Sequence, residues 1–249
     1  MKNVSLAIPF YNTSRYFLEV IKYSLEDDFV SEIIVTDDAS SESEWKKLNG
    51  IVNDLDSDKI KLFRNENNLG GFGIKYNSVK NSTGEWVYLL DSDNHLHETT
   101  LDIIKSIKDP QPNICYAPHS LLMQQDTATK PYETVTYNFK YDLIGIDEAQ
   151  DAIIKRTKYF DWFLNTGNFV FNREKYLERL YNPYVNNEKT FGACSIAFSY
   201  HWMSRGGLCK IVPNMKYYHR TRKDSYWNSC GSNSQKSADY YNNKFINLS

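Results

Sequence analysis

The feature that most constrains the fold is a regular alternation of apolar runs and amphipathic stretches along residues 1–110. Four short apolar runs read as strands, at residues 4–8, 32–36, 59–63 and 85–90. Stretches with helical spacing separate them, and Ser41 and Glu44 form a capping-box pattern at the start of one such stretch. Strands that alternate with helices build βαβ units, so we expect an α/β fold with a mostly parallel central sheet flanked by helices.

The second half of the chain is less regular. It mixes polar turns with strand-like runs at 114–117, 134–139, 168–172 and 208–212, and with helical stretches at 147–155, 173–180 and 192–205. Residues 221–249 form a polar tail rich in Ser, Asn and Lys. Because no internal repeat or linker divides the chain, we expect a single domain.

Charge and composition exclude several classes of protein. The net charge is −2 over 249 residues, which gives no basic surface for nonspecific nucleic-acid binding. The four cysteines form no C-x-x-C pair, and scattered thiols are typical of a reducing compartment. The N-terminus lacks a signal-peptide pattern and no apolar run approaches the roughly 20 residues that span a bilayer. We therefore expect a cytoplasmic chain without a transmembrane segment, and peripheral membrane contact stays open.

The sharpest chemical motif is Asp91-Ser92-Asp93, which directly follows the apolar run at 86–90. In a parallel sheet, ligands bind at the carboxyl ends of the strands. Two carboxylates at this edge suit a hard cation, Mg²⁺ or Mn²⁺, held jointly with a diphosphate. The alternative interpretation of these residues is a polar turn at the end of a strand.

Two further motifs follow strands. Asp37 and Asp38 lie within the sequence TDDAS after the second strand, where an acid is placed to bind a base or a ribose, or to cap the next helix. A glycine-rich stretch, NNLGGFG, covers residues 67–73 and permits close approach of the backbone to a phosphate. A dinucleotide-binding fingerprint would require G-x-G-x-x-G after the first strand, where the sequence is PFYN, so we exclude that class.

Together these motifs resemble the family-2 glycosyltransferases of GT-A fold. The matching segments are IPFYN at 8–12, VTDDAS at 35–40, NNLGGFG at 67–73 and GEWVYLLDSD at 84–93. The resemblance implies a GT-A domain over residues 1–220, with a nucleotide-sugar-binding half at 1–110 and an acceptor-binding half at 111–220. It also implies transfer of a sugar, with inversion, from a nucleotide-diphosphate sugar, most simply a UDP-sugar, to a carbohydrate, lipid-linked glycan or protein.

The resemblance also implies roles for individual residues. Asp91, Asp93 and His219 are expected to bind the metal. His219 lies in the sequence YYHR at 217–220. Asp93 is also expected to stabilise the leaving diphosphate. The residues expected to bind the nucleotide sugar are Pro9, Tyr11, Asn12, Asp38, Asn68, Gly71, Asp91, Ser92, Thr166 and Gly167.

One departure from the family concerns the catalytic base. Family members carry a Glu-Asp pair at the start of the late helix, and its Asp deprotonates the acceptor. Counting back from Pro213 places Cys194-Ser195 at that position, and neither is a competent base near neutral pH without strong perturbation. Glu188, just upstream, is our candidate for the base, and Asp161 is a second candidate.

The sequence leaves alternatives open. One is a GT-A scaffold that binds a nucleotide sugar or glycan without transfer; another is a nucleotidyltransferase, which would need a Gly-rich loop with Arg and Lys after the first strand. His95 and His97, beside the two acids, suggest a zinc site as a minor alternative. The tail at 221–249 is either a lid or a solvated terminus, and as a lid it would bring Arg220, Arg222 and Lys223 to the diphosphate. The donor sugar, the acceptor and the oligomeric state are not determined by the sequence.

Overall fold

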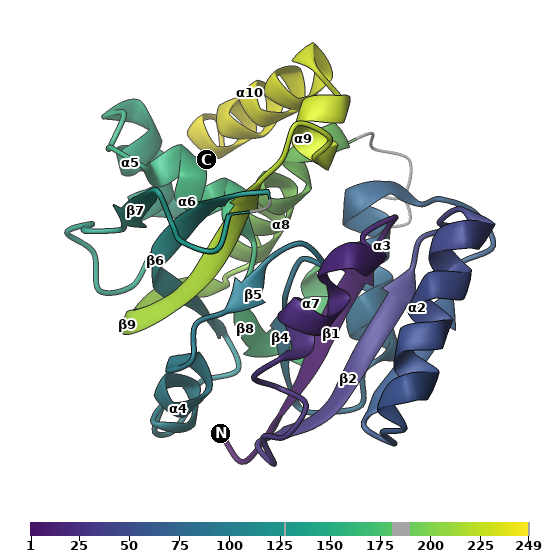
Figure 1. Cartoon of the computed structure of the whole chain (residues 1–249). Helices are drawn as coiled ribbons and strands as arrows, with labels where there is room; N and C mark the ends of the chain where they lie inside the picture. The colour runs from purple at the N-terminus through teal and green to yellow at the C-terminus, as the bar shows by residue number, and fades with distance from the viewer. Residues whose placement is uncertain (127, 181–189, 249) are drawn as a thin grey trace.

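The computed structural model describes residues 1–126, 128–180 and 190–248 of the chain (Figure 1). Its centre is one mixed sheet with helices on both faces. In these described ranges the strand order is β3-β2-β1-β4-β8-β6-β9-β5, and β7 pairs with β6. The expected α/β class is therefore confirmed.

The strands change direction between the two halves of the sheet. β1 pairs in parallel with β2 and β4, and β2 pairs in parallel with β3. β8 is antiparallel to both β4 and β6, whereas β6 and β9 are parallel. The strands are β1 (Val4–Phe10), β2 (Val30–Asp37), β3 (Ile60–Arg64), β4 (Trp86–Leu89), β5 (His95–Leu96), β6 (Ile114–Gln125), β7 (Glu133–Thr136), β8 (Val170–Asn172) and β9 (Leu208–Thr221).

The helices cover both faces of this sheet (Figure 1). They are α1 (Phe17–Ile21), α2 (Glu42–Leu55), α3 (Gly70–Asn81), α4 (Thr100–Lys105), α5 (Ile146–Ile154), α6 (Phe160–Thr166), α7 (Arg173–Leu180), α8 (Cys194–Met203), α9 (Tyr226–Ser229) and α10 (Ser232–Ile246), with 3₁₀ turns at Ser14–Tyr16 and Phe191–Ala193.

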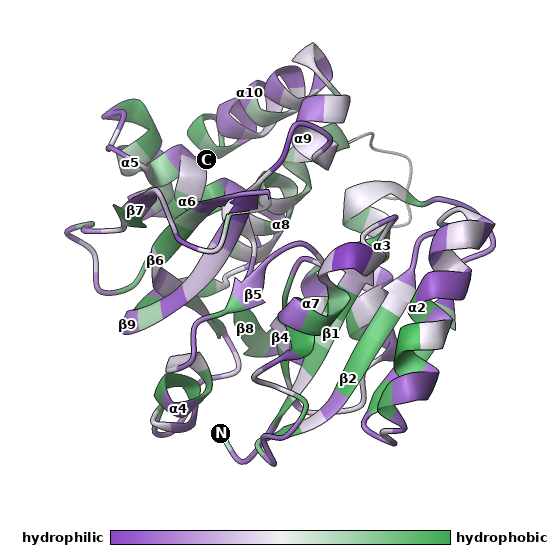
Figure 2. Ribbon diagram, viewed as in Figure 1, coloured by the Kyte–Doolittle hydropathy of each residue, from purple (hydrophilic) through white to green (hydrophobic). Residues whose placement is uncertain are grey.

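The central strands explain why the sheet forms. All seven residues of β1 are buried, and its side chains alternate between the two cores. Leu6 and Ile8 join the core on one face, whereas Ala7 joins the core on the other. Figure 2 shows the hydrophobic centre of β1 and β2 and the hydrophilic positions along α2. A strand buried on both faces is typical of a parallel α/β sheet.

Half of the expected capping box forms at the start of α2. The Ser41 side chain accepts a hydrogen bond from the backbone N–H of Glu44. The Glu44 carboxylate does not return to the Ser41 backbone; it accepts hydrogen bonds from the N–H (3.1 Å) and Oγ (2.6 Å) of Ser14. The acid thereby ties the loop after β1 to the helix after β2.

The largest difference from the sequence expectation is the length of β6 and β9. The expected runs at 114–117 and 208–212 cover only the first part of each strand. The two strands pair from Ile114 opposite Leu208 to Gln125 opposite Thr221, with an irregularity after Pro118. Pro213 and Asn214, the latter with a φ of 64°, interrupt the sequence pattern of β9 without ending the strand. β9 therefore continues beyond Asn214 and includes buried residues such as Tyr217, although the sequence pattern predicts that the strand ends at residue 212.

The C-terminal segment is helical where the structure describes it. Within α10, Ala238, Tyr241 and Phe245 are buried in the core that also contains α8. Figure 1 places α10 beside α8 and α5. No helix in the described part of the chain is long and apolar enough to cross a bilayer.

Candidate functional site

A cavity of about 1110 Å³ lies at the carboxyl ends of β1, β2 and β4, where the α/β rule places a ligand. Most of the residues expected to bind the nucleotide sugar line it. These are Pro9, Tyr11, Asn12, Asp38, Asn68, Gly71, Asp91, Ser92 and Thr166, and the proposed metal ligands Asp93 and His219 line it as well. Gly167 is the exception and is not part of the lining.

The loop after β1 forms one wall of the cavity. Asn12 has a left-handed backbone with a φ of 52°. Its N–H donates to Ser40 Oγ (2.9 Å), and its Oδ1 accepts from the N–H of Ser41 (3.0 Å). These bonds fix the loop beside the end of β2. Tyr11, which is 50% exposed, leaves its ring available to a planar ligand.

Asp38 organises the glycine-rich loop. Its carboxylate accepts hydrogen bonds from the backbone N–H groups of Leu69 (2.9 Å) and Gly70 (3.0 Å) and from Asn65 Nδ2 (2.8 Å). Burial raises the pKa of this carboxyl above its ordinary value, although the three hydrogen bonds oppose that shift. Asp38 therefore shapes the pocket wall, and its acceptor capacity is largely used by the protein itself.

The two acids of the D-S-D motif are each paired with a cation of the chain. Asp91 Oδ1 lies 2.8 Å from Lys75 Nζ, and Asp93 Oδ2 lies 2.9 Å from Arg222 Nε. Ser92 Oγ accepts a hydrogen bond from Thr13 (2.8 Å), which holds the turn against the loop after β1. The site thus combines two carboxylates with two cations that approach from α3 and from the segment after β9.

His219 stands near both acids, at the end of β9. Burial lowers the pKa of its imidazole, while the nearby charges of Asp93 and Asp91 raise it and that of Lys75 lowers it, with a net decrease. The imidazole is consequently neutral near neutral pH, as a metal ligand must be. Among the residues that the structure describes, no three His, Cys, Asp or Glu side chains are gathered as a ligand set. A cation held by Asp93 and His219 would therefore need further ligands from a diphosphate or water.

Lys75 is a site residue that the sequence interpretation missed. It is buried on α3 and donates to Ser195 Oγ (3.1 Å) as well as pairing with Asp91. Burial lowers the pKa of the ammonium, but the charge and hydrogen bond of Asp91, together with the charges of Cys194 and Asp93, raise it above its ordinary value, so that the ammonium stays protonated. A signal was present, because Lys75 falls between Phe72 and Val79 on the apolar face of the helix, where a lysine needs a partner.

Gly167 has a structural role outside the cavity. Its φ is 62°, and a Cβ at this position would lie 2.4 Å from Ser195 Oγ. Glycine therefore permits the end of α6 to pack against the start of α8. The Cys194-Ser195 pair begins α8 and lines the cavity, at the position where the resemblance predicts a Glu-Asp pair. Glu188, our sequence candidate for the base, lies outside the described residues; Asp161 lies on α6 in the cavity wall.

The end of β9 and the residues that follow it contact the D-S-D motif. Besides Asp93, Arg222 pairs with Asp224 (3.0 Å). Arg220 donates to the backbone carbonyl of Asp93 (3.0 Å) and pairs with Glu19, so it braces the motif from behind. Lys223 is exposed and lies outside the lining of the cavity. Of the three basic residues expected at the diphosphate, Arg222 is the one best placed.

The two histidines considered for zinc lie elsewhere. His95 stacks on Tyr218 at 4.3 Å between ring centroids, and burial, with the charges of Arg220 and Lys22, lowers its pKa to about 4. His97 pairs with Thr99 at 3.0 Å. Neither histidine lines the cavity.

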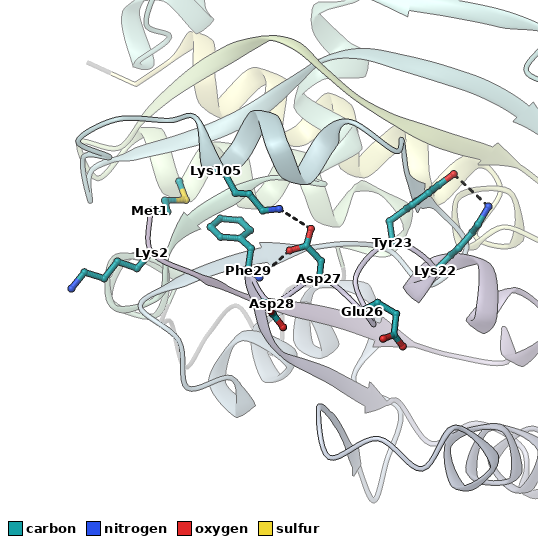
Figure 3. Close-up of a pocket in the computed structure, with 9 residues that line it drawn as sticks. All are labelled: Met1, Lys2, Lys22, Tyr23, Glu26, Asp27, Asp28, Phe29 and Lys105. Carbon is teal, nitrogen blue, oxygen red and sulfur yellow. Dashed lines mark hydrogen bonds and ion pairs between the residues drawn. The ribbon is translucent and has the colours of Figure 1, made fainter.

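A second hollow, of about 790 Å³, lies at the opposite end of the sheet, where β1 and β2 begin (Figure 3). Two of its charged groups are paired: Lys105 Nζ lies 2.9 Å from Asp27, which also accepts a hydrogen bond from the N–H of Phe29 (2.9 Å). None of the residues expected to bind a ligand contributes to it. The cavity at the carboxyl ends is therefore the candidate site.

Comparison with known proteins identifies the family. The model of the family described as glycosyl transferase family 2 matches residues 5–208. The chain therefore belongs to glycosyl transferase family 2, as its motifs predict.

Individual relatives are more distant. Glycosyltransferase GlyG of Streptococcus pneumoniae serotype 4 is 21% identical over 196 residues, which cover 76% of this chain and 61% of GlyG. The crystal structure of Staphylococcus aureus TarS 1–349 with UDP-GlcNAc has a TM-score of 0.63 at 16% identity and covers 99% of this chain and 67% of TarS 1–349. The structure of GalNAc-T7 with UDP, GalNAc and Mn²⁺ has a TM-score of 0.61 at 19% identity, over 89% of this chain and 44% of GalNAc-T7. These two structures confirm the GT-A fold. In sequence, the chain spans about three fifths of the length of GlyG.

Proposed function

We propose that the protein transfers a sugar from a UDP-sugar to a hydroxyl-bearing acceptor, with the 1–110 half binding the donor and the 111–220 half the acceptor. The observation that carries this proposal is the convergence of Tyr11, Asp91 and Asp93 in one cavity with Lys75 and Arg222. Such a cavity offers a flat ring for a base, carboxylates for ribose hydroxyls and cations for a diphosphate. The solved relatives TarS and GalNAc-T7 contain UDP or a UDP-sugar, which supports the choice of nucleotide.

The residues also fit a divalent cation. His219 is neutral, and Asp93 Oδ1 has no donor among the described residues, so both are available to Mn²⁺ or Mg²⁺. When bound, the metal would neutralise charge on the diphosphate that leaves. The presence of Mn²⁺ in the GalNAc-T7 structure supports this assignment.

The residues of the chain itself supply the remaining chemistry. Lys75 and Arg222 place two positive charges beside the cavity, where charge develops on the leaving diphosphate. Arg222 would exchange its partner Asp93 for a phosphate oxygen when the donor arrives. The residues between β9 and α10, at 222–231, would thereby act as a lid that is secured by the ligand.

Calorimetric titration with UDP and a panel of UDP-sugars, with and without Mn²⁺, tests the proposal. We expect Mn²⁺-dependent binding of UDP, and the Asp93→Ala variant is expected to weaken it at least about tenfold because a metal ligand is lost. Asp54→Ala, an exposed acid on α2 outside the cavity, is the matched control and should bind UDP like the wild type. Wild-type protein that binds no UDP compound would contradict the proposed donor.

A second candidate function is donor binding without transfer. It is favoured by one observation, the presence of Cys194 and Ser195 where the family has its catalytic acids. Under this alternative the protein binds UDP-sugars but releases no UDP from them in the presence of any acceptor. Measuring UDP release in the same titration samples separates the two functions.

A further inference from the structure

One face of α6 lines the same cavity as the residues proposed to bind the donor. Asp161, Trp162, Asn165 and Thr166 line the cavity, whereas Phe160, Phe163 and Leu164 are buried in the core. The helix is amphipathic, and its polar side, including one indole, faces the site. None of these side chains except Thr166 has a role in the donor site described above.

Helix α10 also lines the cavity. Gln235, Ala238 and Asn242 line the cavity at positions i, i+3 and i+7, which share one face of a helix. We call the part of the cavity that α6 and α10 line the α6–α10 wing. Its polar lining consists of one carboxylate, three amides and the indole N–H.

Two observations indicate that this wing is built for a polyhydroxylated ligand. The side-chain Oδ1 atoms of Asn165 and Asn242 are buried and have no hydrogen-bond partner in the structure. Buried amide oxygens are normally satisfied, and because both residues line the cavity, a rotation of either side chain would offer its unsatisfied oxygen to a ligand. Trp162 is 44% exposed and its indole is braced by the edge of Tyr159, with ring centroids 6.4 Å apart. A fixed, exposed indole offers a flat apolar face for a ring, and the neighbouring amides offer donors and acceptors for hydroxyls.

Asp161 differs from the other acids of the cavity. Asp38, Asp91, Asp93 and Asp224 are all engaged in hydrogen bonds or ion pairs. Within residues 1–126, 128–180 and 190–248, the Asp161 carboxylate makes no hydrogen bond or ion pair, and it is exposed. An acid that accepts a proton during the reaction must have a free oxygen, and Asp161 meets this condition.

We propose that the α6–α10 wing binds the acceptor as a pyranose, with Trp162 stacked on the sugar ring and Asp161 as the catalytic base. The proposal rests on the function proposed above. In the transfer step the acceptor oxygen bonds to the anomeric carbon of the donor, and the bond from that carbon to the diphosphate breaks. The electron pair of the broken bond goes to UDP, and the proton of the acceptor hydroxyl goes to the Asp161 carboxylate. In this proposal Asp161 on α6 supplies the base that Cys194 and Ser195 at the start of α8 do not.

Direct binding of simple sugars tests the subsite. The probes are the methyl β-glycosides of glucose, galactose and their 2-acetamido analogues, observed by saturation-transfer NMR with UDP present. We expect at least one to bind, with affinity reduced about tenfold or more in Trp162→Ala and retained within about threefold in Trp162→Tyr, which keeps an aromatic face. Tyr132→Ala removes an aromatic side chain of 55% exposure outside the cavity and is the matched control. A wild-type protein that binds no glycoside, or a Trp162→Ala variant that binds like the wild type, overturns the subsite.

Turnover tests the base. With the glycoside that binds and the donor panel, Asp161→Asn should lower kcat for UDP release by about 10² to 10⁴-fold, the usual contribution of a general base, with KM for the glycoside nearly unchanged. Full activity in Asp161→Asn, or a wild-type protein that binds both substrates without releasing UDP, overturns the assignment of Asp161. UDP calorimetry on the wild type separates this result from failure of the proposed function. If UDP does not bind but the glycoside binds through Trp162, the donor proposal fails while the sugar subsite remains.

Discussion

Lys75 shows how much of the site depends on single side chains that come together from distant parts of the sequence. Its ammonium contacts Asp91, 16 positions later by the numbering, and Ser195, which is 120 residues away. The motifs around Asp91 and Asp38 could be recognised from the sequence because each lies next to its own strand. No local pattern reveals that α3 and α8 meet at one lysine, so the pairing of Lys75 with Ser195 had to come from the structure.

Glu32 carries a pH-dependent share of the stability. It is 3% exposed within β2. Burial alone raises the pKa of its carboxyl, but hydrogen bonds from Lys61 (2.8 Å), Ser5 (2.7 Å) and Thr83 (2.6 Å to its N–H) outweigh burial and lower it to about 2. A lowered pKa in the folded state stabilises the protein above about pH 4.5, and this contribution is lost as the pH falls toward 2. We expect the free energy of unfolding to fall by about 2 kcal/mol between about pH 5 and pH 3 on account of Glu32 alone.

Urea unfolding of the wild type and of Glu32→Gln over this pH range measures the effect. The variant should show a flatter pH dependence because an amide does not titrate. Glu133→Gln, which changes an exposed glutamate of β7, should retain the wild-type dependence. Equal slopes for all three proteins would show that the contacts of Glu32 do not depress its pKa.

At the level of elements, the first half of the chain was more predictable than the second. The strands of β1, β2, β3 and β4 form from runs that each carry their own apolar signal, and helix α2 begins at the expected Ser41. β5 and α6 were not expected. β5 has only two residues and forms because it pairs with β9. Helix α6 follows Tyr159, whose φ is 64°, and the sequence rules for helix starts do not include such a residue.

Helix α10 is expected to be a firm part of the core. Phe245 is fully buried and meets Tyr200 edge to face with ring centroids 5.3 Å apart. Replacing it with alanine should lower the free energy of unfolding by about 3–5 kcal/mol, through lost burial and the cavity left behind. Ile246→Ala, at a neighbouring residue that is 40% exposed, should change it by no more than about 0.5 kcal/mol. Denaturant titration gives both values, and equal small effects would mean that the tail is a solvated terminus.

For the whole molecule, the class of fold followed from the sequence, whereas the extent of the cavity did not. Alternating strands and helices indicate a parallel sheet and a ligand at its carboxyl edge, and the structure places Asp91, Asp93 and His219 there. The α6–α10 wing of the cavity is lined by two helices that are about 70 residues apart in sequence and carry no shared motif. Because α6 and α10 line one cavity only in the folded chain, the local periodicity of either helix contains no information about the other.

One continuous sheet with a core on each face is expected to unfold as a single cooperative unit. The cavity is lined from both halves of the chain, so a bound donor should stabilise the whole. At a UDP concentration about 100 times Kd, with Mn²⁺, the gain is about 2.7 kcal/mol, or a rise of roughly 5–10 °C in Tm. Scanning calorimetry with Asp93→Ala as the control measures this shift. Two transitions, of which UDP moves only one, would instead indicate two independent units.

The length of β9 has a consequence for how such a chain can diverge. This strand runs 14 residues from Leu208 to Thr221, pairs with both β6 and β5, and places His219 near the acids of the site and Arg220 on the backbone carbonyl of Asp93. Side chains alternate along a strand, so the insertion or deletion of one residue within β9 before His219 would turn its imidazole to the opposite face. We therefore expect changes in length to be accepted in the loops of the second half but not within β9. The loops on the proposed acceptor side can then differ between relatives while β9 keeps His219 beside Asp91 and Asp93.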